Sequence, residues 1–175
     1  MQLREALLFY LILNIPHIYI HAFTDGKDAP PHEGASFIKA LETRCVDEWP
    51  NTCIASVIGR FYAMDRDMKW DRIQVAYELM TQGKGKAVMS ISEYLRKCYE
   101  QKISDEFIEP AVVADASGMP LATVGTNDAL LFFNFREDSM REITHAFADE
   151  SFQRFPHAKV HNMALVTMTD YEESL

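Results

Sequence analysis

The sequence is poor in cysteine, glycine and positive charge. Its 175 residues include three cysteines and seven glycines, and 17 lysines and arginines stand against 26 aspartates and glutamates, for a net charge of −9. Three cysteines without a CxxC spacing exclude a disulfide-rich scaffold, and they predict free thiols and a cytoplasmic location. The acidic balance argues against a nucleic-acid-binding protein. Positive charge used for function must therefore be local.

Long apolar runs are also scarce, and the one near the N-terminus lacks the features of a membrane anchor. Residues 6–20 are strongly apolar, but Asn14, Pro16 and His17 interrupt the run before the roughly 20 residues that a membrane helix needs. A signal peptide is disfavoured because Glu5 precedes the run and no small-residue cleavage site follows it. We therefore expect a buried helix followed by a buried strand, and no association with a membrane.

The chain instead shows a regular alternation of strand-like and helical segments. Apolar and β-branched runs predict strands over residues 17–21, 53–58, 111–114, 129–135 and 163–169. Helical spacing of apolar residues predicts helices over residues 35–49, 70–80, 90–101 and 138–148. Ser90 is expected to cap one helix and Gly83 to end another. The alternation predicts a single α/β domain, with the strands in one mainly parallel sheet and helices on both faces.

Charged residues gather in the loops that follow three of these strands. The members of these loops are Asp25, Lys27 and Asp28, then Arg60, Asp65, Arg66 and Asp67, and finally Asn134, Arg136, Asp138 and Arg141. Ligands of α/β sheets bind beyond the carboxyl ends of the strands, so these loops are expected to converge. Guanidinium groups offer a planar fork of donors to phosphate or carboxylate, and a neighbouring carboxylate can transfer a proton. Each loop alone fits an ordinary surface ion pair, but the three together predict an anion site.

Two other patterns carry less weight. The segment TQGKGKAV resembles a phosphate-binding loop, but Ala87 follows the lysine where serine or threonine is needed, and a helix C-cap explains the glycines better. The six histidines are scattered along the chain, and His21 fits a bracing role at a strand end better than a ligand role. No metal site is therefore expected in this chain.

Four segments carry a family resemblance: YIHAFTDGKDAPP, ASVIGRFYAMDRDMKWDRIQVAYELMTQGKG, ISDEFIEPAVV and LLFFNFREDSMREI. In this order they resemble the cofactor-independent (2,3-bisphosphoglycerate-independent) phosphoglycerate mutases, over nearly the whole chain. The likeness concerns one of that family's two domains, the substrate-binding (phosphotransferase) domain, which is inserted into an alkaline-phosphatase-like domain. It implies that residues 1–175 are a fragment of a two-domain enzyme. The family's histidine-containing loop before the first helix has no counterpart here.

The resemblance implies an isomerase of glycolysis and gluconeogenesis that interconverts 3- and 2-phosphoglycerate through a phosphoserine. In the family that serine and two divalent metal ions, usually manganese, belong to the other domain. This chain alone is therefore expected to hold no cofactor and to be inactive. Its expected partners are phosphoglycerate and the missing metal-binding domain. The alternative is a stand-alone, non-catalytic module that binds a phosphorylated acid or a partner protein.

The resemblance also assigns roles to single residues. Arg60 and Arg66 match the two arginines of the family's GRYYAMDRD-type motif, and Arg136 matches the first arginine of its RxDR motif. These three are expected to bind substrate. Asp28 matches the aspartate of the DGRD motif, which contacts the glycerate hydroxyl. It is therefore expected to bind substrate and to act as the catalytic acid and base.

Two further substrate-binding positions depart from the family pattern. Lys27 replaces the arginine of DGRD, which keeps the charge and loses the fork of donors. Ser139 replaces the second arginine of RxDR, which loses the charge. Either Arg141 supplies that charge, or Ser139 binds the anion at the N-terminus of the helix over residues 138–148, with the help of free N–H groups and the helix dipole. A third alternative is that Ser139 only caps the helix and the site is weakened.

Overall fold

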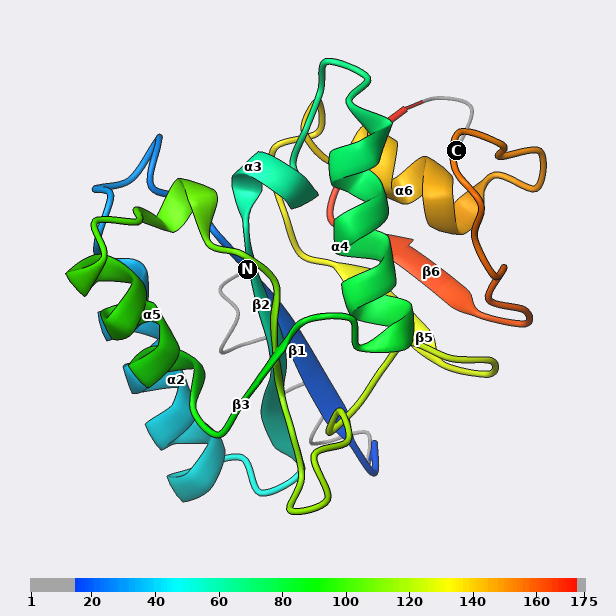
Figure 1. Ribbon diagram of the computed structural model, residues 1–175. Coiled ribbons are helices and arrows are strands. Elements are labelled where there is room, and N and C mark those ends of the chain that lie inside the picture. Colours follow the sequence, from blue (N-terminus) through cyan, green and yellow to red (C-terminus); the bar gives the residue numbers. More distant parts are fainter. Residues whose placement is uncertain (1–14, 173–175) are drawn as a thin grey trace.

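The computed structural model in Figure 1 describes residues 15–172, and the predicted N-terminal helix lies outside them. The elements follow the expected alternation: β1 (Ile18–Thr24), α2 (Gly34–Asp47), β2 (Thr52–Gly59), α3 (Arg60–Ala63), α4 (Trp70–Gln82), β3 (Lys86–Val88), α5 (Ile91–Glu100), the 3-10 helix η1 (Asp105–Phe107), β4 (Ala111–Val113), β5 (Ala129–Phe132), α6 (Arg141–Ala148) and β6 (Ala164–Thr167). The predicted α/β class is confirmed. Three-residue β3 was not predicted, because so short a run carries no periodicity.

The strands form two sheets, so the prediction of a single sheet is wrong. The larger sheet has the order β1-β2-β4-β3, in which β2 and β4 are antiparallel and the other pairs are parallel. Strands β5 and β6 pair in parallel as a separate two-stranded sheet. Both edges of the central strand β2 are taken by β1 and β4, so β5 has no place beside it. Most pairs are nevertheless parallel, as expected.

Helices cover both faces of the larger sheet (Figure 1). On one face α2 and α5 bury Ile38 and Leu95 in a cluster with Val57 of β2. On the other face α4 buries Ile73 against the next residue of that strand, Ile58. Neighbouring side chains of a strand point to opposite faces, so β2 is covered on both sides. This explains why its sequence is a nearly continuous apolar run.

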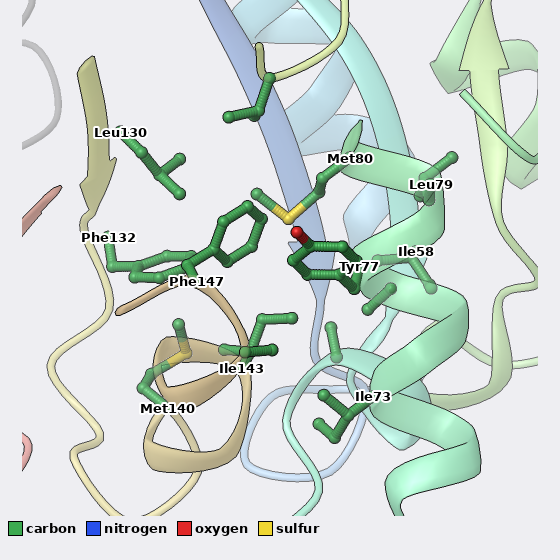
Figure 2. Close-up of a cluster of buried hydrophobic side chains, with 14 of the residues drawn as sticks. Ile58, Ile73, Tyr77, Leu79, Met80, Leu130, Phe132, Met140, Ile143 and Phe147 are labelled. Carbon is green, nitrogen blue, oxygen red and sulfur yellow. The ribbon is translucent and has the colours of Figure 1, made fainter. Parts of the chain in front are cut away.

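The buried cluster that contains Ile58 and Ile73 packs the small sheet against the large one (Figure 2). Tyr77 of α4 lies 4.7 Å from Phe147 of α6, between ring centroids, and Phe147 lies 5.9 Å from Phe132 of β5. Burying each such side chain stabilises the fold by about 1.5–3 kcal/mol. The segment that follows β5 is therefore held against the same body as the loops that follow β1 and β2.

The helix ends test the sequence signals directly. Gly83 ends α4 with a φ of +65°, and a Cβ there would lie 2.3 Å from Cγ of Pro120, so the predicted glycine cap is confirmed. Ser90 caps α5, and its Oγ accepts a hydrogen bond from the N–H of Glu93 at 3.3 Å, also as predicted. Helix α6 begins at Arg141, three residues later than predicted, because residues 138–140 form a turn. Within residues 15–172, no helix has the length and apolarity to cross a membrane.

Candidate anion-binding site

Three segments meet at the carboxyl ends of the parallel strands β1 and β2. The loop after β1 carries Asp28, α3 begins with Arg60 directly after β2, and Arg66 follows α3. The segment after β5 carries Arg136. The structure therefore brings four of the six predicted site residues together. Parallel pairing of β1 with β2 accounts for the first two loops, and the aromatic cluster accounts for the third.

Six side chains of alternating sign form a continuous series of ion pairs across these segments. We call this series the charge chain, and its members in spatial order are Asp25, Arg60, Asp28, Arg136, Asp138 and Arg66. Every guanidinium in it contacts a carboxylate, and charge-assisted hydrogen bonds of this kind are stronger than neutral ones.

The inner part of the charge chain is built around Arg60, whose side chain is only 8% exposed. Its Nη1 donates to Oδ1 of Asp25 at 2.6 Å and to Oδ2 of Asp28 at 2.9 Å. Oδ1 of Asp25 also accepts from the backbone N–H groups of Lys27 and Asp28, at 3.1 and 3.0 Å. Burial alone would lower the pKa of Arg60, but its bonds to the two carboxylates outweigh burial and raise it. The buried Arg60 guanidinium therefore holds the side chain of Asp28 in a fixed orientation.

The outer part of the charge chain is open to solvent. The side chains of Arg66 and Arg136 are 51% and 40% exposed. Arg136 donates to Oδ2 of Asp28, and its Nε lies 3.7 Å from Oδ1 of Asp138. Arg66 donates to Oδ2 of Asp138. Burial would raise the pKa of Asp138, but hydrogen bonds from Arg66 and Ser139 outweigh it and hold the pKa below its usual value.

Lys27 lies at the edge of the site, outside the charge chain. Its exposed Nζ is 3.8 Å from Oε1 of Glu106 in η1. The backbone of the loop passes so close to η1 that a Cβ on Gly26, whose φ is +69°, would lie 2.6 Å from the N atom of Glu106. A glycine is needed at this position, and it brings Lys27 against η1 rather than against the arginines.

Ser139 is placed differently from the prediction. It lies in the turn before α6 rather than at the N-terminus of the helix, it is fully buried, and its Oγ donates to Oδ1 of Asp138 at 3.1 Å. Arg141 does not supply a replacement charge, because its Nε donates to the carbonyl of Tyr171 at 2.7 Å and its Nη2 to Oε1 of Glu137 at 3.0 Å. The arginine of the family motif therefore has no cationic substitute from this helix.

Asp65, a buried carboxylate to which the sequence assigned no role of its own, holds the loop that carries Arg66. Its Oδ2 accepts from the N–H groups of Asp67 and Lys69 at 3.0 and 2.9 Å, and its Oδ1 accepts from Nη1 of Arg72 at 3.0 Å. All of its partners lie within seven residues. The sequence signal for this role is the segment DRDMK, in which Asp65 can accept hydrogen bonds from the backbone N–H groups two and four residues further on.

Asp105 is a second buried carboxylate that sequence reasoning missed. Its Oδ2 accepts from the N–H of Gly34 at 2.8 Å, its Oδ1 from the hydroxyl of Tyr99 at 2.5 Å, and its carbonyl from Oγ1 of Thr24 at 2.7 Å. It thereby fixes both ends of the loop that holds Asp28. No local signal reveals this role, because the contacts span 71 and 81 residues of sequence.

Among residues 15–172, no three His, Cys, Asp or Glu side chains are grouped so that they could hold a metal ion. The arrangement instead offers two exposed guanidiniums to an anion and one oriented carboxylate to a hydroxyl. Fold and site together define an α/β domain that carries exposed arginines at the ends of its strands, an arrangement whose chemistry suits an oxyanion.

Comparison with known proteins identifies the family. The chain matches the family model "BPG-independent PGAM N-terminus (iPGM_N)" over residues 3–173, and it belongs to that family. It is 41% identical over 161 residues to the 2,3-bisphosphoglycerate-independent phosphoglycerate mutase of Myxococcus xanthus, covering 92% of this chain and 31% of the relative. The protein of the same name from Clostridium beijerinckii is 39% identical over 174 residues, covering 99% of this chain and 33% of the relative. The resemblance inferred from the motifs is confirmed.

A solved structure gives the same answer. The phosphoglycerate mutase of Leishmania mexicana, in crystals at low cobalt concentration, superposes with a TM-score of 0.88 at 29% sequence identity. The match covers 94% of this chain and 31% of that chain. The chain thus spans about a third of the length of the relatives it matches.

Proposed function

We propose that this chain is the substrate-binding domain of a 2,3-bisphosphoglycerate-independent phosphoglycerate mutase, an isomerase of glycolysis and gluconeogenesis that interconverts 3- and 2-phosphoglycerate. The observation that carries the proposal is the charge chain, which joins Arg60, Arg66, Arg136 and Asp28 in one site. The relatives that share 39–41% of this sequence bear the name of that enzyme.

Asp28 is suited to handle the glycerate hydroxyl. Its Oδ2 accepts hydrogen bonds from both Arg60 and Arg136, which fixes the plane of the carboxylate. Its Oδ1 makes no hydrogen bond to another described residue, so this oxygen can accept the hydroxyl proton of the substrate and return it later. The half-exposed side chain of Asp28 leaves room for that contact.

The two exposed arginines are suited to hold the charged groups of the substrate. Arg66 and Arg136 can each present two donors to a phosphate or carboxylate, and Lys27 adds a positive charge at the edge of the site. Arg60, being buried and occupied by two carboxylates, contributes by positioning Asp28. Ser139 acts on the site only through Asp138, to which its hydroxyl donates.

The remaining parts of the reaction are assigned to the longer protein. We place the serine that accepts the phosphoryl group, and the two divalent metal ions, manganese by the resemblance, in the part of the relatives beyond this match. The domain alone is then inactive as a mutase, its partner is that metal-binding domain, and its location is cytoplasmic. Conversion of 3- to 2-phosphoglycerate by the purified 175-residue chain would contradict this assignment.

The direct test is a titration of the ¹⁵N-labelled chain with 3-phosphoglycerate, followed by NMR. Binding should be weak, because half of the binding cleft is missing. The amide signals of the loop over residues 25–28 and of Arg60, Arg66 and Arg136 should shift together with one dissociation constant. Shifts confined to other regions, or no shifts at millimolar ligand, would contradict the proposed function.

A further inference from the structure

The charge chain is electrically balanced, and this affects how an anion can enter. It contains three arginines and three aspartates, and each arginine already contacts at least one carboxylate. An anion that approaches such an array meets as much repulsion as attraction, and it also loses its hydration. Binding is therefore favourable only if one carboxylate gives up its place.

The three carboxylates differ in how firmly they are held. Asp25 accepts from Arg60 and from two backbone N–H groups, and Asp28 is fixed by the buried Arg60. Asp138 lies in a turn, and both arginines that it contacts are exposed. Exposed ion pairs of this kind are weak and exchange readily.

Asp138 also has the geometry of a bound anion. Its Oδ2 accepts from Arg66 and its Oδ1 lies 3.7 Å from Nε of Arg136, so one carboxylate bridges the two exposed guanidiniums. The hydroxyl of Ser139 donates to Oδ1 from the buried side and holds the carboxylate in this bridging position. An oxyanion of a ligand would satisfy the same donors in the same place.

We propose that Asp138 is an internal substitute for the ligand's anionic group and that ligand binding is an exchange in which Asp138 leaves Arg66 and Arg136. This makes Asp138 a determinant of affinity that favours ligands able to outcompete a carboxylate. The inference rests on the proposed function and adds to it, because it names the group that the substrate must displace. The oxyanion is a phosphate or a carboxylate, and the experiment separates the two.

The test is Asp138→Asn, which keeps the size of the side chain and removes its charge. Inorganic phosphate, D-glycerate and 3-phosphoglycerate are titrated separately against the wild-type chain and the variant by NMR. Loss of an exposed competing ion pair should tighten binding of 3-phosphoglycerate by about three- to tenfold. Tightening for inorganic phosphate identifies the displacing group as a phosphate, and tightening for glycerate identifies it as a carboxylate.

Asp67→Asn is the matched control. Asp67 is exposed and adjacent in sequence to Arg66, but it makes no ion pair with it among the described residues. Removing its charge should change affinity by less than about twofold. An equal gain in both variants would mean that only the net charge matters, and it would overturn the exchange.

A second variant covers the case in which Asp138→Asn folds poorly. Ser139→Ala removes the hydroxyl that holds Asp138 and should tighten 3-phosphoglycerate binding by about two- to threefold. Unchanged or weaker binding in the folded variants would overturn the inference while leaving the proposed function intact. If neither the wild-type chain nor any variant binds 3-phosphoglycerate, the proposed function fails and the inference fails with it.

Discussion

The inner and outer parts of the charge chain contain the same residue types and behave differently. Arg60 is buried between Asp25 and Asp28, whereas Arg66 and Arg136 are exposed around Asp138. Buried charges must stay paired, because leaving one alone costs several kcal/mol, while exposed charges can change partners at little cost. The inner part is therefore suited to stabilise the site, and the outer part is suited to exchange its carboxylate partner for an anionic ligand.

The supports of the two parts follow the same division. The inner loop is fixed by Asp105, which is bonded to residues far away in sequence. The loop of Arg66 is fixed by Asp65 through partners close in sequence. The first depends on the whole fold and the second is largely a local structure. Changes in the inner part should thus reduce stability, and changes in the outer part should alter ligand affinity: loss of an arginine should weaken binding, and loss of the Asp138 carboxylate should tighten it.

The largest effect is expected for Arg60→Ala. It leaves two carboxylates facing each other without their shared cation, and it should lower the free energy of unfolding by about 2–4 kcal/mol. Urea denaturation measures this, and Arg136→Ala, in the outer part, should cost less than about 1 kcal/mol. Equal losses of unfolding free energy in the two variants would contradict the distinction between an inner part that stabilises the fold and an outer part that binds the ligand.

A pH dependence is expected from the strand that carries the inner loop. Burial lowers the pKa of His21 to about 4, and its Nδ1 lies 2.7 Å from Oγ of Ser56 on the neighbouring strand. Because the unfolded chain takes up this proton first, stability is retained above about pH 6.5 and falls as the pH decreases toward 4. The expected loss is about 1–3 kcal/mol.

Denaturation of the wild-type chain and of His21→Gln between pH 7 and pH 4 isolates this contribution. The difference in unfolding free energy between the two should narrow or change sign as the pH decreases, since glutamine does not titrate. Parallel curves would show that His21 stays accessible to protons in the folded protein. The ion pairs of Asp138 in the outer part should not change between pH 7 and pH 4, because the pKa of Asp138 lies below its usual value.

Arg66→Ala should mainly affect binding. Removal of a charge-assisted contact costs about 1.5–3 kcal/mol, which corresponds to a ten- to hundredfold loss of affinity for 3-phosphoglycerate. Lys69→Ala is the control, since its exposed cation lies in the same loop and outside the charge chain. In the longer protein the same ratio should appear in the activity. Equal losses in both variants would mean that the loop responds only to its total charge.

The sequence predicted the alternation of elements and the convergence of the three loops, because both follow from local periodicity and strand polarity. It could not predict that β5 leaves the main sheet, since the antiparallel pairing of β4 with β2 has no local signal. It predicted α6 too early, because Asp138 and Ser139 are residue types that begin helices, whereas here they form a turn and hydrogen-bond Arg66 and each other. Arg60 and Arg66 looked equivalent because burial is decided by distant contacts.

The smallest effect is expected for Lys27→Arg, which restores the residue of the family motif. A guanidinium offers a fork of donors where an ammonium is a point charge, so a gain is expected only if the side chain reaches the ligand. Lys27 is exposed, lies against Glu106 and takes no part in the charge chain. Affinity for 3-phosphoglycerate should therefore rise by about twofold at most, close to the change expected for a single exposed charge. A tenfold gain would place position 27 within the outer, ligand-binding part, and it would show that this part extends across the loop after β1.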